Sequence, residues 1–463
     1  MKITRQINGA ILVGIRTALA DVHRVSRVES APETKLELCV SAVVRNRRGM
    51  SCKFPPIGIQ ESPRLIFLMA AILQTYIAAA NAVEPWQIFA EPATLNGASV
   101  KLAFDTGSAK NYLLPDTAER LGAILNVTPL ESAHAPPCSG TARCALKLSA
   151  GPGARSNELF FVLSPLYSVP PNGEDGYIGW SFLQKTVFSI DAVARQITFL
   201  QALPKVSKDW LKLRLHSNGS VLYADSPNSK GVVLFDTGDP HGACLRSREW
   251  KAWRRVNPRA PSTVLAESYM DTEQAAVIES WAHQLAIGPL TITETPVTTW
   301  DASLDIDSNV QDVVACLGMA AMRRLKIMVD GPNGLIYIRQ RITPKVAYEH
   351  NRAGVTFTSV TAIPGLWARV LPGTPAYEAG IREGDRLVKL DGVDVGDGSG
   401  LGDLNFEERS ANPNVKLIVE RFGIQHEIQF VLRDLLGPNV PDVSAKVADE
   451  LRHVLRREPY DRH

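Results

Sequence analysis

The sequence has few cysteines and none of the short motifs that mark metal-dependent or serine hydrolases. Only six of its 463 residues are Cys, and no two of them have the Cys-x-x-Cys spacing that is typical of zinc sites. His-Glu-x-x-His does not occur, which excludes a zincin-type metalloprotease. Gly-x-Ser-x-Gly does not occur either, which counts against a serine hydrolase with a nucleophile elbow. The sequence therefore predicts no metal, no cofactor and no seryl chemistry.

An excess of one charge sign is also missing from most of the chain. The formal net charge is +2, yet residues 1–64 hold eleven Lys and Arg against five Asp and Glu. The basic part is therefore the N-terminal leader, and the remainder is slightly acidic. We expect no nucleic-acid partner, because a nucleic-acid-binding domain needs a basic face.

Long hydrophobic runs are absent except for one segment in the leader. Leu65–Ala80 is apolar over about 16 residues, which is short for a membrane span. It follows Arg64 and ends in the small-x-small pattern of a signal-peptidase site, so we predict export to the periplasm with cleavage after Ala82. An uncleaved membrane anchor and a buried helix are the alternatives. Translation from Met50 would give a signal peptide of ordinary length, so Met50 is a candidate for the true start. Residues 1–82 are interpreted as an N-terminal extension and signal peptide and are left out of the fold prediction.

The remaining cysteines are four in number, which fits an oxidising compartment. We predict a disulfide between Cys138 and Cys144, which bracket a short Gly-containing loop, and a second between Cys244 and Cys316. A zinc site is the rival interpretation, and the sequence offers no paired ligand spacing for it.

Against these absences stands an internal repeat. "KLAFDTGSAKN" at 101–111 returns as "VVLFDTGDPHG" at 232–242, in each case an Asp-Thr-Gly turn after an apolar strand. Downstream, 175–200 and 315–338 align on Gly179 and Gly318. Both segments indicate a hydrophobic-hydrophobic-Gly stretch, a helical turn and two strands. The chain therefore contains two copies of a β-rich unit of about 110–140 residues.

The repeat has a chemical consequence if its two copies pack about a pseudo-twofold axis. Asp105 and Asp236 would then face each other at the ends of equivalent strands. Two adjacent carboxylates cannot both ionise freely, so they share a proton and titrate as a pair. One can act as a base on a water molecule while the other acts as an acid.

The paired motifs resemble aspartic proteases of the pepsin and retropepsin clan, specifically bacterial two-lobe retropepsin-like proteins. The resemblance covers about 95–340 and implies a mainly β fold with two homologous β-barrel lobes, 83–205 and 206–342. It implies an aspartic endopeptidase that acts on protein or peptide substrates, with a monomeric catalytic unit. The roles it implies are a catalytic dyad (Asp105, Asp236), loop-linking threonines (Thr106, Thr237), backbone donors (Gly107, Gly238), a hydroxyl donor to Asp105 (Ser108) and bracing strands (Ile178, Gly179, Leu317, Gly318).

The second motif departs from the family pattern at Asp239, where a hydroxyl residue or Ala is usual. An ionised Asp239 would raise the pKa values of the dyad and give activity at a milder pH than that of a pepsin. The alternative is that Asp239 points outward, to an Arg or to substrate. The hairpin at 136–148 is a candidate flap, and an ordinary surface hairpin is the alternative. Trp250 and Trp253 could line a peptide cleft or pack a helix, and we favour packing.

The C-terminal third resembles a PDZ domain of the circularly arranged bacterial kind over 345–436. The matching residues are Gly373-Thr374-Pro375-Ala376, Ala379-Gly380-Ile381, Gly384-Asp385 and Asp391-Gly392. The resemblance implies a peptide ligand bound by strand addition. The peptide-binding residues it implies are Gly354, Val355, Thr356 and Phe357. Residues 437–463 are interpreted as a polar tail with a short helix at 443–456.

Two functions follow from these motifs. The first is an exported aspartic endopeptidase whose PDZ domain positions substrate. The alternative is a catalytically inactive, protease-like protein that binds peptides through its PDZ domain.

Overall fold

The structure is a computed structural model of the chain. It describes residues 43–45, 51–53, 89–90, 93–122, 143–150, 155–163, 173–217, 219–225, 231–267, 275–300, 312–341, 348–360, 363–395 and 413–455. The chain divides into two compact units, residues 1–82 with 400–402, and residues 83–399 with 403–463. In the first unit the described elements are β1 (Val43–Arg45) and β2 (Ser51–Lys53), an antiparallel pair.

The predicted signal segment, 65–80, lies outside the described residues. No helix in the described part of the chain is long and apolar enough to cross a membrane.

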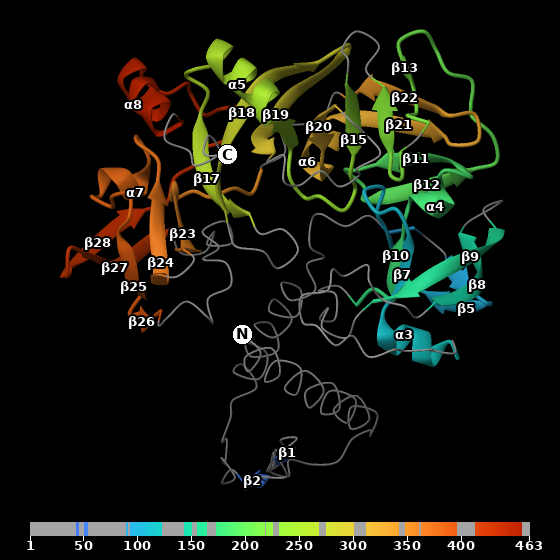
Figure 1. The fold of residues 1–463 in the computed structure, drawn as a ribbon, viewed down its shortest axis with the longest axis horizontal. Coiled ribbons are helices and arrows are strands. Elements are labelled where there is room, and N and C mark those ends of the chain that lie inside the picture. The colour runs from blue at the N-terminus through green and yellow to red at the C-terminus, as the bar shows by residue number, and fades with distance from the viewer. Residues whose placement is uncertain are drawn as a thin grey trace, which may run out of the picture. The chain divides into compact units, whose positions relative to one another are not determined.

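The second unit begins with a large mixed sheet, of thirteen strands in the described residues (Figure 1). Its order is β13-β22-β21-β11-β12-β3-β6-β10-β7-β9-β8-β4-β5. The bounds are β3 (Phe89–Ala90), β4 (Ala93–Leu95), β5 (Ala98–Val100), β6 (Leu102–Phe104), β7 (Asn111–Leu113), β8 (Arg143–Ala150), β9 (Arg155–Val162), β10 (Gly176–Ile178), β11 (Val187–Asp191), β12 (Gln196–Leu200), β13 (Leu211–Arg214), β21 (Leu325–Asp330) and β22 (Leu335–Gln340), with helices α3 (Pro115–Arg120) and α4 (Trp180–Leu183).

A sheet of seven described strands follows, in the order β14-β15-β20-β16-β19-β18-β17. Its elements are β14 (Tyr223–Asp225), β15 (Val232–Phe235), β16 (Ala243–Arg246), α5 (Ser247–Val256), β17 (Ser262–Glu267), β18 (Ala275–Ile287), β19 (Leu290–Trp300), β20 (Val313–Leu317) and α6 (Met319–Met322). All four residues of β15 are buried, as a Val- and Leu-rich strand without polar alternation requires.

The two halves repeat one local topology around the Asp-Thr-Gly turns. In the first, β10 pairs parallel with β6 and antiparallel with β7. In the second, β20 pairs parallel with β15 and antiparallel with β16. A four-residue helix, α4 or α6, follows the central strand each time. The duplication seen in the sequence is therefore present in three dimensions.

The two halves are also joined by hydrogen bonds. Strand β11 of the first half pairs antiparallel with β21 of the second, in a register that sets Val187 opposite Asp330. The predicted boundary between separate lobes is thus crossed by one continuous sheet.

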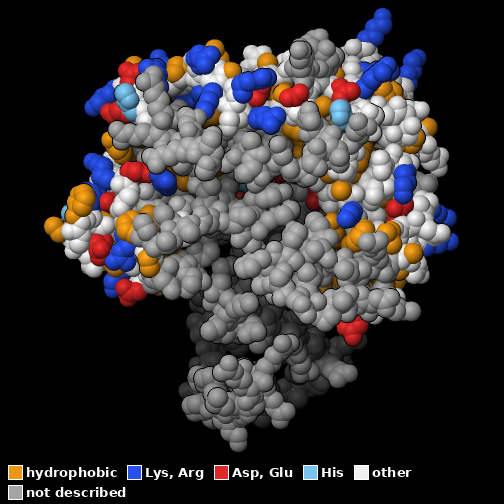
Figure 2. Space-filling view, viewed as in Figure 1, with side chains coloured by type: hydrophobic (Ala, Val, Ile, Leu, Met, Phe, Trp, Pro, Cys, Tyr) orange, Lys and Arg blue, Asp and Glu red, His pale blue; other side chains and the backbone are white. Residues whose placement is uncertain are grey.

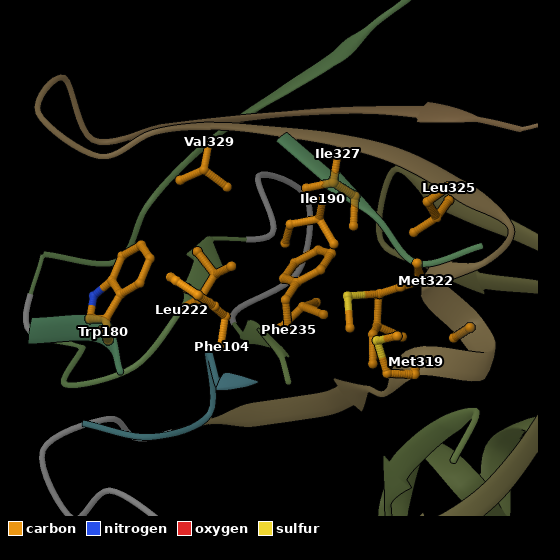
Figure 3. Close-up of a cluster of buried hydrophobic side chains, with 14 of the residues drawn as sticks. Phe104, Trp180, Ile190, Leu222, Phe235, Met319, Met322, Leu325, Ile327 and Val329 are labelled. Atoms are coloured by element: carbon orange, nitrogen blue, oxygen red, sulfur yellow. The ribbon is translucent and has the colours of Figure 1, made fainter. Parts of the chain in front are cut away.

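One hydrophobic cluster underlies both Asp-Thr-Gly turns (Figure 3). Phe104 and Phe235, each one residue before an Asp, are buried in it. Ile190 from β11 and Ile327 from β21 are buried in the same cluster. Burying large apolar side chains here fixes the ends of β6 and β15, and therefore the positions of the residues that follow them.

The C-terminal sheet has the order β23-β24-β25-β27-β28, with β26 paired to β25. Its bounds are β23 (Val355–Val360), β24 (Ile363–Val370), α7 (Pro375–Glu378), β25 (Arg386–Leu390), β26 (Val393–Asp394), β27 (Asn414–Arg421) and β28 (Ile424–Val431). Both residues of the Asp391-Gly392 turn have positive φ, as a two-residue hairpin needs. Helix α8 (Ala445–Leu455) lies within the range predicted for the C-terminal helix, 443–456, and its Leu451 belongs to the core.

Candidate functional site

The structure brings Asp105 and Asp236 together at the ends of β6 and β15. A Cβ atom added to Gly107 would lie 2.3 Å from the Asp236 Cγ atom, and one added to Gly238 would lie 2.9 Å from the Asp105 Cγ atom. Each glycine therefore faces the carboxylate of the opposite loop. No larger residue fits at Gly107 without displacing Asp236.

The two loops are cross-linked by their threonines. The Thr106 backbone N–H donates to Thr237 Oγ1 at 3.0 Å, and the Thr237 N–H donates to Thr106 Oγ1 at 3.0 Å. The Thr106 hydroxyl donates to the Phe235 carbonyl (2.6 Å), and the Thr237 hydroxyl to the Phe104 carbonyl (2.5 Å). Both threonines are fully buried. Because each of these hydrogen bonds joins the two halves, the threonine cross-link fixes the separation of the two carboxylates.

Backbone groups of each loop hold its own carboxylate. The Gly107 N–H donates to Asp105 Oδ1 at 2.9 Å, and the Gly238 N–H donates to Asp236 Oδ1 at 2.8 Å. The role implied for the Ser108 side chain is wrong. Its hydroxyl donates to the Lys110 carbonyl at 3.0 Å instead of to Asp105, because the turn directs the side chain along its own strand.

The hydrophobic-hydrophobic-Gly strands lie directly against the loops. The Asp105 N–H donates to the Ile178 carbonyl, and the Asp236 N–H to the Leu317 carbonyl, at 2.9 and 3.0 Å. A Cβ on Gly179 or Gly318 would come within 2.3 or 2.5 Å of a loop carbonyl oxygen. Glycine is needed at both positions because backbone meets backbone there.

Burial raises the pKa of Asp105 above its ordinary value, although hydrogen bonds oppose the rise. Burial also raises the pKa of Asp236, well above its ordinary value, and the charges of Asp105 and then Asp239 raise it further. The pair therefore retains a proton under conditions where exposed carboxylates have lost theirs. One carboxyl can donate a hydrogen bond while the other accepts one.

Asp239 adds negative charge beside the pair, as the sequence predicts, but it does not point outward to an Arg. Its Oδ1 atom accepts from the His241 backbone N–H at 2.9 Å and contacts His241 Nδ1 at 2.8 Å. Sequence reasoning missed His241, although its position two residues after Asp239 was a signal. The loop thus pairs an acid with an imidazole, and the charge of that acid acts on the carboxylate pair.

The predicted disulfide between Cys244 and Cys316 is wrong, since the structure forms no disulfide at either residue. The residues do face each other across β16 and β20. The Cys316 Sγ atom, however, lies 3.9 Å from Asp239 Oδ2 as a hydrogen-bond donor. Burial and then the charge of Asp239 raise the pKa of Cys316 well above its usual value, which keeps the thiol protonated. Cys138, and with it the other predicted disulfide, lies outside the described residues.

Trp250 and Trp253 belong to α5, with stacked rings whose centroids are 5.5 Å apart. Both are buried, in agreement with the packing interpretation. A cavity of about 1420 Å³ opens beside Trp253, between α5 and the β18–β19 turn. Most of the candidate flap, 136–148, lies outside the described residues.

The implied PDZ peptide-binding residues lie at the start of β23, the terminal strand of its sheet. Gly354 has a φ of +69°, and an added Cβ would lie 2.2 Å from the Thr374 Cβ atom. Val355, Thr356 and Phe357 are all buried. The loop therefore has the tight turn that the resemblance implies, but its residues are not open to solvent.

The N–H groups of this loop are bound by a side chain of the same segment. Asn351 Oδ1 accepts from the Ala353 N–H at 2.9 Å and from the Gly354 N–H at 3.0 Å. Asn351 Nδ2 donates to the Val355 carbonyl at 2.8 Å. No motif in the sequence indicates this arrangement.

Comparison with known proteins identifies a PDZ domain in the C-terminal part. The family model for the PDZ domain matches residues 368–421. The chain is also 39% identical over 77 residues to a putative serine protease, HhoA, of Synechocystis sp.; the match covers 16% of this chain and 19% of the relative. The chain thus spans about a fifth of the length of this curated relative. The protein is mainly β, with a C-terminal PDZ domain.

The comparison contradicts the prediction of an aspartic-type endopeptidase that acts by two aspartates. The relative that the chain matches is named as a serine protease. Aspartic-protease activity is therefore not assigned to the carboxylate pair, although the two loops have the geometry that the resemblance to aspartic proteases implies.

Proposed function

We propose that this protein binds peptides, and that its PDZ domain takes the C-terminal carboxylate of its ligand. The observation that carries the proposal is the match of a PDZ domain to residues 368–421. In such domains a peptide adds as a strand to the sheet edge, and backbone N–H groups hold its carboxylate. Strand β23 and the turn at Gly354 supply that edge and that loop.

The two repeats upstream form, in this proposal, a pair of retropepsin-like lobes that contribute a second contact to the ligand. The common topology of β6–β10–β7 and β15–β20–β16 supports their homology. In this proposal Asp105 and Asp236 are the residues by which the two lobes contact the ligand. A carboxyl pair with one shared proton both donates and accepts, so it matches a neutral polar group such as a peptide carbonyl or hydroxyl.

The surface charge is consistent with a peptide ligand. On the face shown in Figure 2, basic and acidic side chains are interspersed over the described atoms. A ligand of mixed composition suits such a surface better than a polyanion does. Export of the chain, with loss of residues 1–82, is part of the proposal and rests on the apolar run at 65–80.

The test is binding of fluorescein-labelled peptides with a free or an amidated C-terminus to the exported chain, with the peptide checked for integrity by mass spectrometry. We expect binding of the free-carboxylate form and loss of binding on amidation. Asp105→Asn and Asp236→Asn should weaken binding of longer peptides and spare peptides that reach only the PDZ domain. Cleavage by the wild type that both substitutions abolish would overturn the binding proposal and make the pair hydrolytic.

A further inference from the structure

Strand β23 is the terminal strand of the PDZ sheet, yet it is covered. Residues 355–358 are all buried, although alternate side chains of a strand point to opposite faces. Strands β17 and β18 of the seven-stranded sheet lie against it. Both β17 and β23 are terminal strands of their own sheets. The strand that a PDZ domain offers to a peptide is therefore covered by another part of the same protein.

Two hydrogen bonds join the segment before β23 to the seven-stranded sheet, and both come from one rung of β17 and β18. Thr263 and Glu279 are directly opposite each other in that ladder. The Thr263 hydroxyl donates to the Asn351 carbonyl at 2.6 Å, and the Tyr348 hydroxyl donates to Glu279 Oε1 at 2.5 Å. The ring of Tyr348 also packs beside Trp281 of β18. The segment 348–351, which leads into the PDZ loop, is thus anchored to the β17–β18 edge.

This anchored segment supplies the residue that binds the loop. The Asn351 amide oxygen accepts from the Ala353 and Gly354 N–H groups. These N–H groups stand where an incoming carboxylate would be bound. An amide oxygen already satisfies them, so a peptide carboxylate must displace Asn351 before it can bind.

We propose that strands β17 and β18 and the side chain of Asn351 hold the PDZ domain in a closed state, in which its own chain covers the peptide site. This proposal rests on the proposed peptide binding. A peptide with a free C-terminal carboxylate then binds only after segment 348–351 leaves these strands. The apparent affinity is reduced by the fraction of molecules that are open. Any ligand that separates the two sheets raises the affinity of the PDZ domain, and a bound peptide in turn favours separation.

The experiment measures binding of one probe to the full chain by fluorescence anisotropy. The probe is a fluorescein-labelled peptide that ends in Tyr-Val-Ala with a free carboxylate, and its amide is the negative control. Thr263→Val removes one of the two hydrogen bonds that anchor segment 348–351 but leaves the Asn351 side chain in place, and Asn351→Ala removes the acceptor. Thr298→Val is the matched control, because Thr298 is a buried threonine on β19 whose hydroxyl donates to Ile278 within the same sheet.

We expect Thr263→Val to bind the probe about 3–10-fold more tightly than the wild type, because the free energy of one hydrogen bond corresponds to a change in affinity of this size. Asn351→Ala should bind more tightly still, and Thr298→Val should match the wild type. Hydrogen exchange at the Ala353 and Gly354 amides should quicken in Thr263→Val, which shows opening without reference to the probe.

Two results overturn the inference and differ in what they say of peptide binding. If the wild type binds the free-carboxylate probe as tightly as both variants, the site is open and peptide binding stands. If no variant binds the probe although amide exchange quickens, the proposed peptide binding fails as well.

Discussion

The threonine cross-link beneath the carboxylate pair should be a major source of stability, and Thr237→Val tests this. Valine keeps the shape of threonine but removes Oγ1. That atom accepts from the Thr106 N–H and donates to the Phe104 carbonyl. The substitution therefore takes one partner from each of two backbone groups in a fully buried site.

The expected cost follows from the number of groups affected. A buried donor or acceptor left without a partner costs about 1–3 kcal/mol, so the loss for two such groups should be about 2–6 kcal/mol. Thr298→Val removes a single donated bond, to the Ile278 carbonyl, and should cost about 1 kcal/mol. The double variant Thr106→Val/Thr237→Val should cost less than the sum of the single ones, because both residues belong to one network.

Urea unfolding followed by tryptophan fluorescence measures these differences in the full chain. The midpoint should fall for Thr237→Val while the slope stays that of the wild type. A Thr237→Val chain that is no less stable than Thr298→Val would refute the reasoning, since it would mean that water or a rearranged loop satisfies the backbone groups.

Three further predictions concern titration and close packing. Since burial raises the pKa of Asp236 above 3.8 in the folded state, its ionisation costs stability as the pH rises. Melting temperatures of Asp236→Asn should therefore gain on those of the wild type as the pH rises above about 4, and a constant difference would contradict this. Gly107→Ala should drive the Asp236 carboxyl away and lower its pKa, which carbon NMR titration measures; an unchanged titration curve would show that the loop yields instead. The Leu435 N–H donates to His350 Nε2, and burial lowers the pKa of His350 below 6.5. The contribution of His350 to stability should therefore fall as the pH drops below about 6.5. A melting temperature that stays level in this range would contradict the prediction.

The sequence predicted those parts of the site whose geometry is forced by backbone spacing. Asp-Thr-Gly after an apolar strand, with a distant hydrophobic-hydrophobic-Gly stretch, has little freedom once β6 pairs with β10 and β15 with β20. The glycines at 179 and 318 are needed because carbonyl oxygens approach them closely. Such a motif predicts a local structure, but it did not predict the activity.

What the sequence could not predict depends on side-chain rotamers and on contacts between distant segments. The spacing in "DTGDPHG" puts His241 within reach of Asp239, but it does not determine that the Asp239 side chain turns back to the imidazole. Cys244 and Cys316 face each other as a disulfide would require, yet adjacency alone does not decide whether thiols oxidise. The bond from Thr263 to Asn351 joins residues 88 positions apart, with no periodic pattern to indicate it.

The pairing of β11 with β21 has a consequence for how this chain is assembled. Through it, β11 of the first half has one neighbour, β12, from its own half and another, β21, that is made later in synthesis. A chain cut after Leu200 would present β11 as a bare edge, ready to pair with any other strand. The sheet of the first half is therefore completed only after the second half has been made. A fragment that contains the first half alone should dimerise or aggregate under conditions in which the whole chain does not.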